Sequence, residues 1–219
     1  MSDFYTADQR QLQDDFETRP LADTLVAVMV KHELADVPAA FIESRDFFFL
    51  STVTPEGEPT VSYKGGAPGF VRVIDEHTLA FPSYDGNGMF LSLGNIISTA
   101  KIGMLFIDFE TPHRLRVQAT AQVAAKDDPI VEQFPGADLV VVATVDAAFV
   151  NCGRYIHKHT RTEDSPYVPA DDGSAPLPAW KRIDALQDAL PPRDQGRAEL
   201  DGGTIDGAEY AEGIREGRP

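Results

Sequence analysis

Seven short strand-like segments follow one another between residues 47 and 152, and this run constrains the fold more than any other feature of the sequence. Turn sequences such as TPEGEP, IDEH and ETPH separate the segments. One helical pattern, near residue 90, interrupts the run. Short strands at near-regular spacing are typical of an antiparallel barrel that is closed or nearly closed. The segments are FFFLSTV, TVSYK, FVRVI, TLAF, KIGMLFIDF, RLRVQATAQV and LVVVATVDAAFV.

The cleanest alternation lies in RLRVQATAQV, residues 114–123. Arg114 and Arg116 share one face of this strand with Gln118 and Thr120, and the apolar residues between them share the other face. Because alternate residues of a strand stand about 6 to 7 Å apart, the two arginines can converge on one anion. A solvated strand face is the more common alternative for such a pair.

The sequence SYDGNGMFLSLGNI, residues 83–96, begins with turn-forming residues and then becomes apolar at helical spacing. Met89, Phe90, Leu93, Ile96 and Ile97 recur at three- and four-residue intervals, which predicts a tight turn that opens a helix. Two interpretations compete for this turn. It is either a plain capped turn or an anion site built from the free amides of a helix N-terminus.

A lysine ends another predicted strand. Lys64 closes the segment TVSYK, and Thr60 and Ser62 share its face. Three glycines among residues 65–69 follow and let the backbone turn closely. Together with the two arginines, this lysine favours an anion site over a solvated strand face.

The chain is strongly acidic, with 19 Lys and Arg against 35 Asp and Glu and a formal net charge of −16. Phosphate backbones require a surplus of cations on one face, so this balance argues against nucleic-acid binding. The first residues carry acids where a secretory signal needs a basic start, and no run approaches the roughly 18 apolar residues of a membrane span. We therefore expect a cytoplasmic protein with no membrane or nucleic-acid partner.

The chain contains one cysteine, Cys152, which excludes an internal disulfide framework and a multi-cysteine zinc site. Cys152, His157 and His159 in NCGRYIHKH carry metal-ligating groups, but no further cysteine or close acid completes a set. We expect no metal site and interpret this segment as a strand end followed by a row of basic residues at the edge of the barrel.

The pattern divides the chain into three parts. Residues 1–40 are expected to form an N-terminal helical extension. The helical pattern covers residues 7–35, and Pro38 prevents it from continuing further. Residues 41–159 form the barrel domain. Residues 160–219 are rich in proline, glycine and acids, so we expect an extended C-terminal segment that is draped on the barrel or partly disordered.

Five segments occur in order along residues 41–157: FFFLSTVTPEGEPTVSYKGG, GFVRVIDEHTLAFPSYDGNGMFLSLGNI, KIGMLFIDFE, RLRVQATAQV and NCGRYIHKH. In this order they resemble the FMN-binding split-barrel family that includes pyridoxamine 5′-phosphate oxidase, and in particular its oxidase-related branch. The resemblance implies a mainly β fold with flanking helices, that is, an FMN-binding split β-barrel of antiparallel strands.

The resemblance also implies a homodimer that holds FMN in a groove between its subunits. The vitamin B6 oxidases carry an adjacent Arg-Lys pair at the turn where this chain has GNG, so the cation for the phosphate must come from elsewhere. A helix N-terminus supplies about half a positive charge. The implied phosphate contacts are Lys64, Asn87, Gly88, Met89 and Asn95, with Ser62, Tyr84 and Asp85 near the flavin ring or ribityl chain and with Arg114 and Arg116 adding charge from a neighbouring strand.

From this resemblance we expect an FMN-dependent oxidoreductase acting on a small molecule, with NADPH or NADH as a candidate electron donor. The flavin carries the electron chemistry, so no catalytic side chain is assigned. The vitamin B6 oxidases finish with a strand that carries a Trp and an Arg-Leu-His type motif, whereas this chain ends AEGIREGRP. We therefore do not expect a true pyridoxine-phosphate oxidase. Two alternatives stay open: a non-catalytic flavin store or sensor, and a barrel that binds haem or a deazaflavin.

Overall fold

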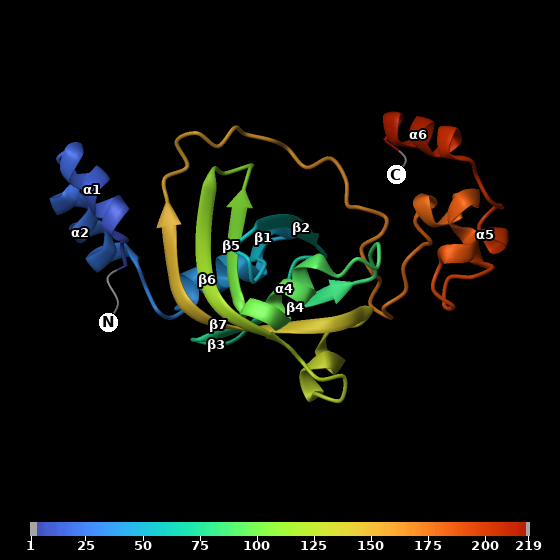
Figure 1. Cartoon of the computed structure of the whole chain (residues 1–219), viewed down its shortest axis with the longest axis horizontal. Helices are drawn as coiled ribbons and strands as arrows, with labels where there is room; N and C mark the ends of the chain where they lie inside the picture. Colours follow the sequence, from blue (N-terminus) through green and yellow to red (C-terminus); the bar gives the residue numbers. More distant parts are fainter. Residues whose placement is uncertain (1–3, 218–219) are drawn as a thin grey trace. The chain divides into compact units, whose positions relative to one another are not determined.

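The computed structural model describes residues 4–217, which form two compact units that divide after Thr162. The first unit contains a seven-stranded antiparallel sheet with the order β2-β1-β5-β6-β7-β4-β3 (Figure 1). All seven predicted strands are present, and the predicted mainly β, antiparallel fold with flanking helices is confirmed. The strands are β1 (Phe47–Val53), β2 (Pro59–Gly65), β3 (Arg72–Asp75), β4 (Thr78–Tyr84), β5 (Lys101–Asp108), β6 (His113–Val123) and β7 (Ala137–Asn151).

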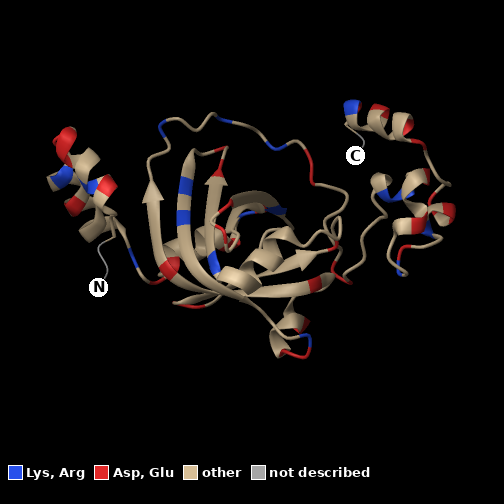
Figure 2. Ribbon diagram, in the orientation of Figure 1, with Lys and Arg blue, Asp and Glu red and all other residues tan. Residues whose placement is uncertain are grey.

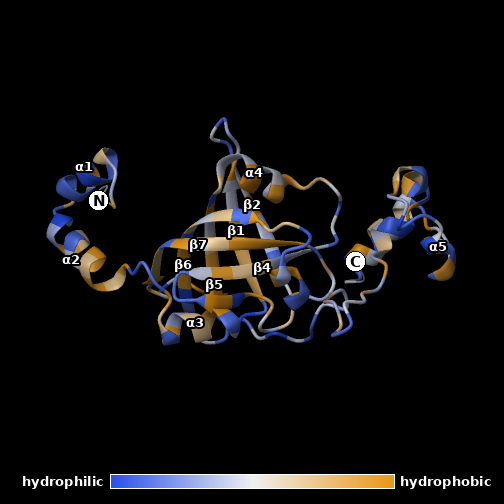
Figure 3. Ribbon diagram, turned by 90° about the horizontal axis from the view of Figure 1, so that it is seen from below, coloured by the Kyte–Doolittle hydropathy of each residue, from blue (hydrophilic) through white to orange (hydrophobic). Residues whose placement is uncertain are grey.

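The sheet curves around an apolar core, and the side facing this core is called the inner face. Phe48 of β1 is fully buried, and its ring centroid lies 5.1 Å from those of Phe81 and Phe106. Leu93 and Ile96 of helix α4 (Leu91–Thr99) join the same cluster. Figure 3 shows apolar positions concentrated along the strands. Aromatic rings and β-branched residues therefore fill the space that the curved sheet encloses.

Helix α4 begins and ends in left-handed backbone. Phe90 before the helix has a φ of 51°, and Ala100 after it has a φ of 59°. Leu93 and Ile96 are buried as the helical spacing predicts, but Met89, Phe90 and Ile97 are exposed. The apolar face of α4 is therefore narrower than the sequence pattern suggests.

Helix α3 (Asp36–Glu43) is bonded to the edge strand β3 and to the turn that precedes it. The Oε1 atom of Glu43 accepts a hydrogen bond from the backbone N–H of Val73 in β3 at 3.1 Å. Its carbonyl oxygen accepts a second bond from the N–H of Gly69 at 2.7 Å. A Cβ atom at Gly66 would lie 2.6 Å from the ring of Phe70, so this turn requires glycine. These contacts fix the path of the chain from β2 to β3.

The N-terminal region corrects the prediction of one helical pattern that ends at Pro38. It contains α1 (Ala7–Asp15) and α2 (Arg19–Met29), separated at Glu17, whose φ is 55°. Lys31 then pairs with Ala148 through two backbone hydrogen bonds of 2.9 and 2.7 Å. Pro38 lies in the first turn of α3, where its missing N–H has no partner to lose. The proline therefore starts a helix instead of ending one.

The second unit, residues 163–217, contains short helices, where an extended or partly disordered segment was expected. The side chains of Lys181 and Asp194 form an ion pair of 2.6 Å and are 2% and 1% exposed. How this unit packs on the barrel stays a prediction. The helices of this unit are η2 (Ala179–Arg182), η3 (Asp184–Ala189), α5 (Arg197–Leu200) and α6 (Gly207–Arg215).

In the first unit, a further short helix, η1 (Pro129–Gln133), lies between β6 and β7.

Among residues 4–217, no helix combines the length and the apolar character that crossing a membrane requires.

Candidate functional site

A row of polar side chains joins α4 to the inner face of β1 and β2. The amide nitrogen of Asn95 donates to the hydroxyl oxygen of Thr52 at 3.0 Å and to that of Thr60 at 3.4 Å. The two threonine hydroxyls lie 2.8 Å apart. One turn earlier on the helix, the hydroxyl oxygen of Ser92 lies 3.1 Å from that of Ser62. The predicted residues Ser62 and Asn95 therefore lie in the same polar row, and the Asn95 side chain is already hydrogen-bonded within the protein.

Lys64 continues this row toward the beginning of the helix. Asn95 contacts Thr60, and Ser92 contacts Ser62, so moving two residues along β2 corresponds to moving one turn back along α4. The same progression places Lys64 level with the N-terminal end of α4. Its cross-strand partner is the fully buried Phe48, which confirms that Lys64 projects from the inner face.

The Lys64 ammonium is half-buried and lacks a protein partner. Among residues 4–217, it forms no ion pair and no hydrogen bond. Burial lowers the pKa of its ammonium group below the ordinary value of lysine. An unpaired charge in this position is costly, and a bound anion would offset that cost.

The turn before α4 carries features of both predicted interpretations. The side-chain oxygen of Asn87 accepts a hydrogen bond from the N–H of Met89 at 3.0 Å, so this amide is capped by the turn itself. Gly88 has a φ of 75°, which favours glycine. The first helical amides, those of Leu91, Ser92 and Leu93, have no acceptor among residues 4–217, and no side chain caps the helix. Free amides at a helix N-terminus are able to bind an anion.

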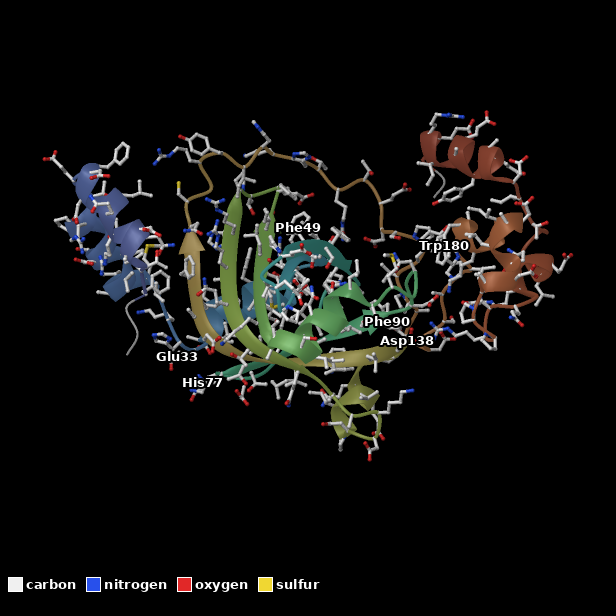
Figure 4. All side chains as sticks on the ribbon, in the orientation of Figure 1. Glu33, Phe49, His77, Phe90, Asp138 and Trp180 are labelled. Atoms are coloured by element: carbon white, nitrogen blue, oxygen red, sulfur yellow. The ribbon has the colours of Figure 1, made fainter. Side chains whose placement is uncertain are left out.

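Tyr84 and Asp85 lie at the end of β4, immediately before this turn. Burial raises the pKa of the Tyr84 phenol, so the hydroxyl stays protonated and can donate a hydrogen bond at neutral pH. Asp85 is exposed. Phe90, labelled in Figure 4, is also exposed at the beginning of α4. A phenol and a carboxylate therefore come directly before this turn in the chain.

Arg114 and Arg116 lie on the opposite face of the sheet from Lys64. Arg116 pairs with Leu105 of β5, and Leu105 pairs with Phe49 of β1. Cross-strand partners share a face and consecutive residues alternate, so Phe49 and Phe48 project from opposite faces. Because Lys64 pairs with Phe48, the arginines do not share its site within one chain.

The outer face, on which the arginines lie, also carries a groove that sequence reasoning missed. The groove has a volume of about 430 Å³, within the range of small-molecule sites. The groove is deep at Ser51 and Gly103, because these two small residues are cross-strand partners and leave space above the sheet. At one end, the Lys101 ammonium pairs with the Asp146 carboxylate at 3.1 Å. The only signal in the sequence was the pair of small residues, and its meaning depends on the register.

The segment NCGRYIHKH begins at Asn151, the last residue of β7. Cys152 is exposed, and the ring of His159 packs against Phe109 with centroids 5.0 Å apart. Among residues 4–217, no group of three or more His, Cys, Asp and Glu side chains is arranged to hold a metal ion.

A seven-stranded antiparallel split barrel with a polar row against α4 defines the class of this protein. The family model described as pyridoxamine 5′-phosphate oxidase matches residues 34–143, half of the chain. The chain therefore belongs to the pyridoxamine 5′-phosphate oxidase family, as the sequence resemblance predicted. No curated protein matches the sequence.

Several solved structures are similar to this chain at low identity. HupZ from Group A Streptococcus is 17% identical, with a TM-score of 0.42 over 52% of this chain and 92% of that one. HutZ, the haem storage protein of Vibrio cholerae, is 18% identical, with a TM-score of 0.40 over 50% and 89%. An FMN-binding protein of Syntrophomonas wolfei is 12% identical, with a TM-score of 0.38 over 64% and 97%.

Proposed function

We propose that this protein is a homodimeric FMN-binding flavoprotein that acts as an oxidoreductase on a small molecule. One observation carries the proposal: the half-buried, unpaired ammonium of Lys64 lies level with the uncapped N-terminus of α4. A phosphate monoester is dianionic near neutral pH, and it matches a site made of one cation and several backbone amides.

The residues around this position fit the rest of the cofactor. Lys64 and the amides of Leu91–Leu93 would hold the phosphate, and the Ser62 hydroxyl lies beside them. Tyr84 and Asp85 would face the ribityl chain or the ring from the end of β4. Asn87 would shape the turn through its bond to Met89, and Asn95 would fix α4 against β1 and β2.

The outer face supplies the argument for a dimer. Val61 and Tyr63 of the edge strand β2 are 70% and 62% exposed, and the Tyr63 ring stacks on Phe47 at 5.3 Å. If this face packs against a second copy, Arg114 and Arg116 of one subunit can approach the flavin of the other. The dimer then unites residues that the register separates within one chain.

The bound flavin would supply electron transfer to or from the substrate. The chain's own residues would bind the phosphate, orient the ring and exclude water from it. No side chain is required to form a covalent bond, and none is assigned as catalytic.

The absorbance spectrum of the purified protein tests this proposal. We expect flavin bands at a ratio close to one per chain, or their recovery when FMN is added to the flavin-free protein. Bleaching by NADPH or NADH under anaerobic conditions supports the enzyme, whereas bound flavin that no donor reduces supports the store or sensor. A Soret band without flavin would contradict the proposal and identify a haem-binding barrel.

A further inference from the structure

Three arginines gather where β6 meets the loop that follows β7. Arg114 and Arg116 project from the outer face of β6, and Arg154 lies in the loop that follows β7. Figure 2 shows basic positions on β6 and along this loop. We call Arg114, Arg116 and Arg154 the basic rim.

The basic rim is not neutralised by the protein. Among residues 4–217, none of its three guanidinium groups forms an ion pair with a carboxylate. Arg154 lies over the ring of Tyr155, at 5.7 Å from its centroid. In a chain of net charge −16, acids are abundant, so three arginines without an acidic partner are unexpected. Unpaired cations that are close together repel one another unless an anion joins them.

Two buried polar atoms mark the same place. Arg114 pairs with Asn151 across β6 and β7. The Nε atom of Arg114 and the Oδ1 atom of Asn151 are each shielded from solvent, and neither has a hydrogen-bond partner. One is a donor and the other an acceptor. A ligand with an anionic oxygen and a neighbouring hydroxyl would satisfy both atoms.

Cys152 lies beside these groups and responds to their charge. The backbone N–H of Arg154 lowers the pKa of the Cys152 thiol, and the guanidinium groups of Arg154 and Arg114 lower it further. The charge of two rim arginines is therefore felt at one exposed sulfur atom. Because the chain has no other cysteine, this thiol is a built-in reporter of the rim.

We propose that the basic rim binds the anionic group, a phosphate or a carboxylate, of the small molecule that the flavin oxidises or reduces. This assignment of the substrate class depends on the proposed function, whereas anion binding by the rim does not. The rim lies on the outer face, and the Lys64 site lies on the inner face, so they are separate anion sites within one chain.

The rate at which iodoacetamide alkylates Cys152 tests the proposal in both flavin-free and FMN-loaded protein. Iodoacetamide is neutral, so it does not compete with anions for the rim. A bound anion offsets the positive charge of the arginines and so raises the pKa of the Cys152 thiol. At a pH below that pKa, each unit by which the pKa rises lowers the fraction of reactive thiolate about tenfold. We expect inorganic phosphate to slow alkylation several-fold, compared with sodium chloride of equal ionic strength. Citrate, measured in parallel, distinguishes a carboxylate site from a phosphate site.

Two variants serve as the test and its control. Arg154→Gln should alkylate more slowly without phosphate and lose most of the further protection by phosphate, while its FMN affinity stays unchanged. Lys126→Gln removes a cation from the exposed turn before η1 and should behave as the unmodified protein. The Arg154→Gln variant retains the backbone N–H that bonds Cys152, so its folding should be preserved.

The possible failures are distinguishable. Equal alkylation rates in phosphate, citrate and chloride would overturn the proposal, because the rim would then bind neither anion. If FMN slows the alkylation of Cys152 but inorganic phosphate does not, the proposal is also overturned. The rim would then be a second contact for the phosphate of the cofactor. Phosphate protection in a protein that binds no FMN would leave the rim intact and reject the proposed function instead.

Discussion

The hydroxyl oxygens of Ser62 in β2 and Ser92 in α4 lie 3.1 Å apart, and this contact aligns the helix with the edge strand. One turn further along, Asn95 bonds Thr60, so β2 and α4 are matched at two successive levels. Extended by one more turn, the same alignment brings Lys64 level with the turn that precedes α4.

Lys64→Ala should weaken FMN binding by about 1.5 to 3 kcal/mol, the range for a lost charge-assisted hydrogen bond. Riboflavin, which lacks the phosphate, should bind weakly to both proteins and show little difference between them. Fluorescence quenching of the flavin on titration measures both affinities. Lys126→Ala is the matched control. Unchanged FMN affinity in Lys64→Ala would reject the phosphate site.

FMN binding should weaken as the pH rises through the lowered pKa of Lys64. Burial favours the neutral amine, and the phosphate requires the ammonium form, so binding takes up a proton in this range. Above about pH 7 the phosphate itself no longer titrates, since its second pKa is near 6. A titration series at increasing pH should therefore show a loss of affinity that disappears in Lys64→Ala.

The same pKa has an opposite effect on the flavin-free protein. Between the lowered pKa of Lys64 in the folded chain and its ordinary value in the unfolded chain, the unfolded state binds more protons. The free energy of unfolding therefore increases as the pH rises through this window, because Lys64 then destabilises the folded state less. Urea unfolding of the flavin-free protein across this range, compared with Lys64→Ala, measures the difference.

The protein should sediment as a species of twice 23.9 kDa, with a total interface above about 2,000 Å². Because the exposed residues of β2 are apolar, added salt should have little effect on the dimer. Val61→Asp places a charge on this face and should shift the equilibrium toward the monomer. An FMN-loaded monomer of the unmodified chain would contradict the prediction.

FMN-loaded protein should not convert pyridoxine 5′-phosphate or pyridoxamine 5′-phosphate to pyridoxal 5′-phosphate at an ordinary enzymic rate. The chain lacks the Trp and Arg-Leu-His type motif that would clamp the substrate phosphate, and each lost charge-assisted bond costs about 1.5 to 3 kcal/mol. The aldehyde absorbance of the product, followed in air, measures the rate. Steady production would show that the missing motif is unimportant.

Lys181→Met should unfold residues 163–217 at lower urea concentration than in the unmodified protein. The substitution leaves the buried carboxylate of Asp194 with only its 3.5 Å contact to the exposed guanidinium of Arg197, and breaking a buried ion pair costs about 3 to 5 kcal/mol. The fluorescence of Trp180, the only tryptophan, reports on this unit. Replacing both partners, as Lys181→Met with Asp194→Leu, should recover most of the loss. If the single variant is as stable as the parent, the ion pair does not hold the unit together.

Local patterns in the sequence were enough to predict the barrel and the two faces of the strand at residues 114–123. The alternation around Leu115 and Val117 depends only on the two-residue period of a strand, and both residues are buried as predicted. Local chemistry also predicted the turn that opens α4. At Pro38 the same reasoning failed, because a proline ends a helix in its interior but is tolerated in its first turn.

The sequence by itself determined the candidate residues for binding an anion: Lys64, the turn before α4, and the arginines of β6. Only the tertiary structure decided how they are grouped. The alternation of side chains between the two faces of a strand is a local property. The choice of neighbouring strands, and the register in which they pair, depends on contacts between distant parts of the chain. The pairs Phe48–Lys64 and Leu105–Arg116 place the lysine and the arginine on opposite faces of one sheet. The register likewise opposes Ser51 to Gly103 and so creates the groove, because two small side chains leave space only where they meet.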